Sequence, residues 1–224
     1  MEMPMLFVNE MFASVQGEAT FAGVPSVFVR MQGCLCKCDF CDTKYTWKLG
    51  EPNEKPITFA MQKADAPRYA TTNAEELAET IIREYPNIKH IVFTGGEPCL
   101  FNLRDVGYLL EYSGRDIQVE TSGTENIAVT PKTWVTISPK INQRGGRKVK
   151  PAYLTLADEI KMAVGSQEDI DNLRQYVLPY VRPTTPIYLQ PISQGDEATK
   201  LCVETAMANN WRVSIQTHKY LNLR

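Results

Sequence analysis

The chain has 224 residues, of which 43% are hydrophobic, and its 24 lysines and arginines nearly balance 26 aspartates and glutamates. This length predicts one domain with a single large core, and the net charge of −2 argues against a protein that coats nucleic acid or an anionic membrane. No apolar run approaches the roughly 20 residues that span a bilayer, and the N-terminus lacks the pattern of a secretory signal. We expect a globular cytoplasmic protein that binds neither membranes nor nucleic acid.

Short β-rich runs alternate with amphipathic helical patterns along the chain. The predicted strands span residues 26–30, 90–94, 117–120, 134–137, 159–161, 187–190 and 213–216. Predicted helices begin at a capping box, Thr72-Asn73-Ala74-Glu75, and behind Asn102, Ser166 and Asp196. The alternation predicts an α/β fold with a mainly parallel sheet, either doubly wound or a complete or partial βα barrel.

One stretch interrupts this alternation. Residues 50–71 are rich in proline, lysine and alanine and carry no clear helix or strand period. We interpret them as an insertion or mobile loop within a single domain that spans residues 1–224.

Glycines and polar residues gather where the predicted strands end. The clusters are Gly33-Cys34, Gly95-Gly96-Glu97-Pro98, Glu120-Thr121-Ser122-Gly123, Ser138-Pro139-Lys140, Gln190-Pro191 and Thr217-His218-Lys219. Since the carboxyl ends of parallel strands form one rim, where ligands bind, these clusters predict a single site.

Four of the six cysteines lie within eight residues. Cys34, Cys38 and Cys41 form a C-x3-C-x2-C triplet, which can hold three irons of a 4Fe–4S cubane and leave the fourth open to a cofactor or substrate. Cys36 is then predicted to be a spectator. A structural zinc site that uses all four thiols is the alternative, although such sites usually join two cysteine pairs a dozen or more residues apart.

The triplet and the glycine motif together carry a family resemblance. C-x3-C-x-aromatic-C, with Phe40 before Cys41, resembles the cluster loop of radical S-adenosylmethionine (SAM) enzymes, and Gly95-Gly96-Glu97-Pro98 resembles their SAM-binding motif. The two glycines are expected to let the ligand approach the backbone closely, and Glu97 to supply negative charge near an ammonium group. The resemblance implies SAM contacts from Gly96 and from Ser138, Pro139 and Lys140.

The resemblance extends over nearly the whole chain. Further matching segments are Asn9–Phe12, Val15–Glu18, Arg30, Cys41-Asp42-Thr43, Thr94, Glu120–Gly123, Leu189–Pro191 and Gln216–Lys219. Together they resemble the 7-carboxy-7-deazaguanine synthase family of the queuosine pathway. This resemblance implies a partial βα barrel of the radical SAM type, and a lyase that converts 6-carboxy-5,6,7,8-tetrahydropterin to 7-carboxy-7-deazaguanine with loss of ammonia. It also implies Mg²⁺ as a third cofactor, a reductant such as flavodoxin or ferredoxin, and a homodimer.

The resemblance assigns roles to particular residues. Arg30 would bind the substrate carboxylate, because its planar fork matches two oxygens. Val15, Gln16, Gly17 and Thr94 would contact the pterin. Thr43 would supply an oxygen ligand to Mg²⁺. No catalytic residue is expected beyond the cofactors.

Rival interpretations stay open from the sequence. Arg30 could pair with a surface carboxylate, Gln16 and Glu18 could be exposed loop residues, and Thr43 could cap a turn. Within the superfamily, an activase that generates a glycyl radical on a partner enzyme would share the triplet and the glycine motif. From another class, a zinc- or cluster-binding interaction module remains an alternative.

Overall fold

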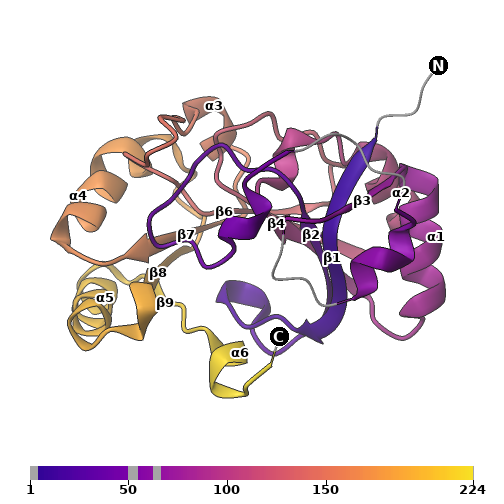
Figure 1. The fold of residues 1–224 in the computed structure, drawn as a ribbon. Helices are drawn as coiled ribbons and strands as arrows, with labels where there is room; N and C mark the ends of the chain where they lie inside the picture. The colour runs from indigo at the N-terminus through magenta and orange to yellow at the C-terminus, as the bar shows by residue number, and fades with distance from the viewer. Residues whose placement is uncertain (1–4, 50–54, 63–66, 224) are drawn as a thin grey trace.

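The computed structural model describes residues 5–49, 55–62 and 67–223. This part of the chain forms one sheet of nine strands in the order β3-β1-β2-β4-β5-β6-β7-β8-β9 (Figure 1). The strands are β1 (Leu6–Val15), β2 (Pro25–Met31), β3 (Ala70–Thr72), β4 (His90–Gly95), β5 (Asp116–Thr121), β6 (Trp134–Ile137), β7 (Glu159–Val164), β8 (Ile187–Pro191) and β9 (Arg212–Val213).

The sheet is mainly parallel and open. All neighbours from β2 to β9 are parallel, whereas β1 pairs antiparallel with both β2 and β3. Within the described residues the edge strands β3 and β9 do not pair with each other. The prediction of an α/β partial barrel is therefore confirmed.

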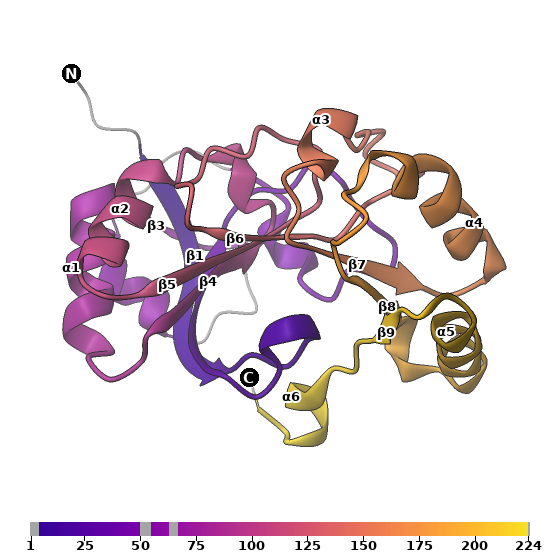
Figure 2. The ribbon, with the colours of Figure 1, turned by 180° about the vertical axis from the view of Figure 1, so that it is seen from behind.

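Helices pack against the sheet through apolar stripes. They are α1 (Ala74–Glu84), α2 (Arg104–Tyr112), α3 (Pro151–Leu154), α4 (Gln167–Tyr176), α5 (Asp196–Asn209) and α6 (Thr217–Tyr220). Figures 1 and 2 show α1 and α2 side by side at the β1 end of the sheet, and α4 and α5 at the β8–β9 end. The buried stripes are Leu77 and Ile81 of α1, Val106 and Leu110 of α2, Ile170 and Leu173 of α4, and Ala198 and Cys202 of α5. No helix in the described residues is long and apolar enough to cross a bilayer.

The helix starts follow the predictions to within one residue. Asp196 is the first residue of α5, whereas at α2 the N-cap is Leu103 rather than the predicted Asn102, whose Oδ1 accepts from Arg104 N (3.1 Å). Ser166 and Asp169 form a reciprocal capping box at α4. At α1 the prediction of Thr72 as the cap is wrong: Asn73 is the N-cap, and its side chain accepts a hydrogen bond from Glu76 N (2.9 Å). Thr72 ends β3 and donates instead to the Glu76 carboxylate. The cap shifts by one residue because Thr72 is already paired with β1.

The N-terminal segment departs most from the sequence prediction. Residues 9–12 and Val15 do not precede the first strand but form it, as β1. The strand was missed because its polar side chains Asn9 and Glu10 are both buried, and a register shift against β2 between Val8 and Glu10 breaks the period-two pattern.

The predicted strand at 213–216 is wrong beyond Val213. The chain leaves the sheet there, because Ser214 Oγ accepts a hydrogen bond from Ala19 N (3.1 Å) and Thr217 N donates to Gly17 O (2.9 Å). The C-terminal segment therefore crosses to the turn after β1 rather than extending β9. Figure 1 shows α6, in yellow, beside this turn.

The stretch predicted as an insertion is partly described. Residues 50–54 and 63–66 lie outside the described residues. The described part contains a 3-10 turn, η3 (Ile57–Met61), in which Ile57 and Ala60 are buried in the main core. It also contributes Ala70 and Thr71 to β3, which pairs with β1.

Candidate active site

A cavity of about 400 Å³ lies at the carboxyl ends of the parallel strands, as the rim clusters predicted. Most of the predicted site residues line it: Val15, Gln16, Arg30, Cys34, Cys38, Cys41, Thr43, Thr94, Gly96, Ser138 and Lys140. Gly17 and Pro139 do not reach the wall, although the residues beside them in the chain do. The fold thus brings segments from both halves of the chain to one site.

Backbone hydrogen bonds join the two motifs that carry the resemblance. Gly96 N donates to Met31 O (3.0 Å), and Glu97 N donates to Gly33 O (2.6 Å). A Cβ atom on Gly96 would lie 2.1 Å from Gly33 O, and one on Gly95 would lie 2.4 Å from Met31 N. Gly95 also has a φ of +120°, which disfavours any other residue. The glycines are therefore required to dock the end of β4 onto the start of the cysteine loop.

Glu97 ties two strand ends together. It is buried, and its carboxylate accepts hydrogen bonds from Cys99 N (3.0 Å) and from Thr121 Oγ1 (2.6 Å). It also accepts from the backbone N–H (2.9 Å) and the hydroxyl of Ser122. The three bonds from Thr121 and Ser122 fix the end of β5 to the glycine motif, a task that the sequence did not indicate.

All four clustered thiols line the cavity, and Cys36 and Cys38 are buried. A hydrogen bond with Cys36 and burial raise the pKa of the Cys34 thiol, and burial raises that of Cys38 to about 11. Hydrogen bonds from Cys34 and from the Ser122 and Thr124 hydroxyls lower the pKa of Cys36 to about 6 despite its burial. Since cluster ligands are thiolates, cluster assembly would release protons from Cys34 and Cys38.

The donor set fits a cluster better than a single ion. One zinc ion would draw its thiolates to about 2.3 Å from a common point. Among the described residues, no three histidine, cysteine, aspartate or glutamate side chains are arranged to hold one metal ion. A cubane carries its irons at separate corners and so takes thiolates that are further apart. The zinc alternative therefore finds no support in the geometry.

Lys140 links the fourth strand-end cluster to the cysteine loop. Its Nζ donates to Ser138 Oγ (2.6 Å) and lies 5.7 Å from the centre of the Phe40 ring. Pro139 between them is buried and shapes the turn behind the wall. A cationic group thus faces the cavity beside the thiols.

One edge of the Arg30 guanidinium is hydrogen-bonded to Glu10, and the other edge is open to the cavity. Its Nε donates to Glu10 Oε2 (3.1 Å), so Arg30 does pair with a carboxylate, although Glu10 is buried and does not lie at the surface as the rival interpretation expected. The guanidinium also lies 5.8 Å from the centre of the Phe12 ring. Among the described residues its two Nη atoms have no hydrogen-bond partner, which leaves the fork for a ligand carboxylate.

Three comparisons with known proteins identify relatives of this chain. Residues 15–156 match the model of a 4Fe-4S single cluster domain. Two relatives named 7-carboxy-7-deazaguanine synthase, from Escherichia coli K12 and Buchnera aphidicola, are 46% and 41% identical; the alignments cover 96% and 97% of this chain and 98% of each relative. The crystal structure of QueE from Escherichia coli superposes with a TM-score of 0.89 at 44% identity, covering 95% of this chain and 94% of that one. The chain belongs to the 7-carboxy-7-deazaguanine synthase family. The resemblance predicted from the motifs is confirmed.

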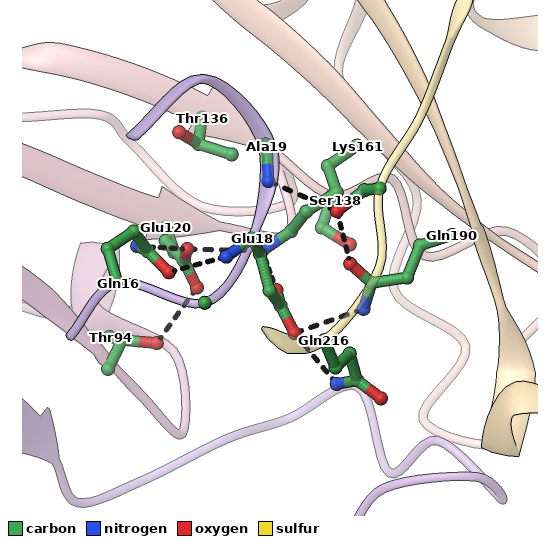
Figure 3. Close-up of polar contacts among 12 residues, drawn as sticks. Gln16, Glu18, Ala19, Thr94, Glu120, Thr136, Ser138, Lys161, Gln190 and Gln216 are labelled. Carbon is green, nitrogen blue, oxygen red and sulfur yellow. Dashed lines mark hydrogen bonds and ion pairs between the residues drawn. The ribbon is translucent and has the colours of Figure 1, made fainter. Parts of the chain in front are cut away.

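In this family member the cavity floor is a partly buried polar network (Figure 3). Gln16 Nε2 donates to Glu120 Oε1 and Gln118 Oε1 (3.2 Å each), and Thr94 Oγ1 donates to Glu120 Oε2 (3.4 Å). Glu18 and Glu120 both pair with Lys161. Gln16 and Glu18 are therefore not exposed loop residues.

Gly17 has a structural task in this arrangement. Its carbonyl accepts hydrogen bonds from Thr217 N and Oγ1 (2.9 Å each), and a Cβ atom would lie 2.1 Å from His218 Nδ1. The missing side chain lets the C-terminal segment close against the turn after β1. His218 thereby reaches the cavity wall, where burial lowers its pKa.

Some residues of the wall were missed as site residues, although the sequence held a signal for one of them. Lys161 follows Ile160 and precedes Met162 in a strand with buried neighbours, and a lysine in such a run needs a charged partner. Gln190 was predicted only as a rim residue, and Gln216 only as the end of a strand and part of a segment that matches the family. Their role depends on the approach of the C-terminal segment, which has no local sequence signal.

Replacing Gly96 by alanine tests the docking of the two motifs. The new Cβ would overlap Gly33 O, so we expect a loss of about 1–3 kcal/mol of stability and much weaker SAM binding. Gly165→Ala is the matched control, because its Cβ would meet only side-chain tips: Ile192 Cδ1 at 3.3 Å and Asp169 Oδ2 at 3.7 Å. Denaturant unfolding and calorimetric SAM titration check this; unaltered SAM affinity in Gly96→Ala would refute the docking role.

Proposed function

We propose that this chain converts 6-carboxy-5,6,7,8-tetrahydropterin to 7-carboxy-7-deazaguanine with release of ammonia, as a radical SAM lyase of queuosine biosynthesis. One observation supports this most strongly: the C-x3-C-x2-C thiols, the docked glycine motif and the open fork of Arg30 share one cavity. Membership in the 7-carboxy-7-deazaguanine synthase family supports the same reaction.

The residues present divide into three groups around the cavity. Cys34, Cys38 and Cys41 would hold a 4Fe–4S cluster, and Gly96 with the segment 138–140 would hold SAM. When bound, the reduced cluster and SAM supply the one-electron chemistry that starts the reaction. The chain's own task is to bind the pterin in one orientation and to exclude water.

Arg30 orients the pterin by its carboxylate. Because Glu10 holds Nε, the two Nη atoms keep one direction and offer a bidentate contact. Gln16 and Thr94 lie on the floor below, where Glu120 fixes their side chains. Val15 lines the wall beside them.

We assign Mg²⁺ to the Thr43 hydroxyl. Thr43 lines the cavity next to Asp42, and its Oγ1 lies 3.6 Å from Cys41 Sγ. Magnesium keeps several waters and needs few protein ligands, so one hydroxyl and a substrate carboxylate are a reasonable set.

The remaining proposals concern partners and setting. A small electron carrier such as flavodoxin or ferredoxin would reduce the cluster; the side chains of Leu35 and Phe40 in the cysteine loop are 40% exposed, which gives such a carrier access. We further propose a cytoplasmic homodimer, acting upstream of tRNA modification, in which residues 1–224 form one domain with an insertion at 50–71.

Product analysis tests the function directly. Anaerobic incubation of the reconstituted protein with the carboxylated pterin, SAM, Mg²⁺ and a reductant should yield 7-carboxy-7-deazaguanine, identified by mass. Turnover without any partner protein would exclude a glycyl-radical activase. SAM cleavage with no change in the pterin would reject the proposed substrate.

The cluster ligands are tested by single substitutions. Cys34→Ala, Cys38→Ala and Cys41→Ala should each lose the cluster, because each removes one of three iron ligands. Cys36→Ala is the matched control from the same loop and should keep most of the iron. Iron and sulfide analysis after anaerobic reconstitution measures this. Equal iron loss in the Cys36 variant would show that the triplet is assigned wrongly.

Arg30→Lys tests recognition of the substrate carboxylate. Lysine keeps the positive charge but loses the planar fork, so pterin affinity should fall by about 1.5–3 kcal/mol, the range for a charged hydrogen-bond pair. SAM cleavage in the absence of pterin should stay at the wild-type rate. Calorimetry and SAM-cleavage assays separate the two effects, and unchanged pterin affinity would reject this role.

A further inference from the structure

Lys161 is the charged centre of the cavity floor. It lies in β7 between the buried residues Ile160 and Met162, and is itself 5% exposed. Its Nζ donates to Glu18, on the turn after β1, and to Glu120 Oε1 (3.1 Å), at the end of β5 (Figure 3). One ammonium group thus joins two carboxylates that come from opposite sides of the cavity.

Each carboxylate in turn holds uncharged polar side chains. Glu120 accepts hydrogen bonds from Gln16 Nε2 (3.2 Å) and Thr94 Oγ1 (3.4 Å). Both donors are proposed pterin contacts. The position of these contacts therefore depends on the position and charge of Glu120.

Glu18 does the same for the other side of the floor. Its Oε1 accepts hydrogen bonds from Gln190 Nε2 (3.2 Å), in β8, and Gln216 Nε2 (2.7 Å), in the C-terminal segment. Glu18 thereby connects the turn after β1 to the C-terminal segment that follows β9. Among the described strands, β9 is an edge of the open sheet, so no strand pairing makes this connection.

The charge balance of this group depends on the ammonium. Burial by itself raises the pKa of Glu18, but the Lys161 charge and hydrogen bonds from Lys161 and Gln216 bring it down to about 2. Burial lowers the pKa of Lys161, but Glu120 and Glu18 outweigh this and raise it overall. Without the ammonium, two largely buried carboxylates, with side chains 12% and 17% exposed, would lie close together and one would take up a proton. A protonated carboxyl group donates where it had accepted, so a bonded side chain would have to turn.

We propose that Lys161 is a positioning residue: its ammonium holds the Glu18 and Glu120 carboxylates in place, so that the polar side chains bonded to them keep their positions around the substrate. The inference rests on the proposed function, because it treats the floor as the pterin-binding surface. It adds a requirement that neither the cluster nor SAM imposes, since the hydrogen bonds of Lys161 go to Glu18 and Glu120 and not to the cysteine loop or the glycine motif.

Lys161→Met, which keeps the length of the side chain and removes its charge, tests this in the reconstituted protein. Pterin affinity, measured anaerobically relative to wild type, should fall at least about tenfold. The deficit should be larger at pH 6 than at pH 8, because lower pH protonates the unpaired carboxylates. Iron content and SAM affinity should not change. His218 also faces Glu18 and Lys161, and the Lys161 charge helps to lower its pKa. The pH comparison is therefore repeated with His218→Gln in both backgrounds, where the larger deficit at pH 6 should persist.

Two controls accompany this variant. Lys200→Met removes the same charge from the exposed face of α5, where the Lys200 side chain is 76% exposed, and should bind the pterin as wild type does. Lys161→Gln carries the same test should Lys161→Met fold poorly, because it also removes the charge. Loss of affinity in Lys200→Met equal to that in Lys161→Met would overturn the proposal.

Infrared difference spectroscopy supplies a readout that needs no substrate. The infrared spectrum of Lys161→Met minus that of wild type should show the C=O band of a protonated carboxyl group. The double variant Lys161→Met with Glu18→Gln should lack this band, since one carboxylate no longer faces another. Absence of the band would overturn the positioning role. So would a pterin affinity of Lys161→Met equal to that of wild type at both pH values. Failure of wild type to bind the pterin would instead reject the proposed function, while the band would still report the charge coupling.

Discussion

The candidate site depends on a short backbone contact between two strand ends. Where β2 ends, the carbonyls of Met31 and Gly33 accept hydrogen bonds from Gly96 and Glu97 at the end of β4. The contact is possible only because Gly95 and Gly96 have no Cβ atom that would overlap the backbone of Met31 and Gly33. The cysteine loop that starts at Gly33 therefore cannot move independently of the glycine motif. A cluster on the loop and a ligand on the motif would share one frame, as a reaction between them requires.

A second, deeper constraint comes from buried polar side chains below the cavity. His90 Nε2 lies 2.9 Å from Gln118 Oε1, Gln118 donates to Thr136 (2.8 Å), and Thr136 donates to Glu159 (2.7 Å). Thr20 N, on the turn after β1, donates to Glu159 Oε2 (3.2 Å). These bonds cross four adjacent strands and fasten the turn that carries Gln16 and Glu18. Since a buried polar group without a partner is costly, this row holds the floor in one arrangement.

Much of this could be predicted from the sequence because its signals are local. The β4–β8 strands show apolar runs bounded by turn residues, and the cysteine triplet and Gly95–Pro98 are contiguous motifs. What failed depends on distant partners. In β1, Asn9 and Glu10 look like loop residues until Gln32 and Arg30 pair with them across the sheet. Nothing near Lys161 in the chain predicts its two carboxylates, which lie 143 and 41 residues away.

The most direct test of the account is the electron paramagnetic resonance spectrum of the reduced, anaerobically reconstituted protein with and without SAM. If three thiolates hold a cubane on the loop that is docked to the glycine motif, the protein should contain about four irons per chain. Its signal should also change on saturation with SAM, because the open iron then gains a ligand. A cluster signal that SAM does not alter, or a metal centre of one zinc without iron, would contradict the account.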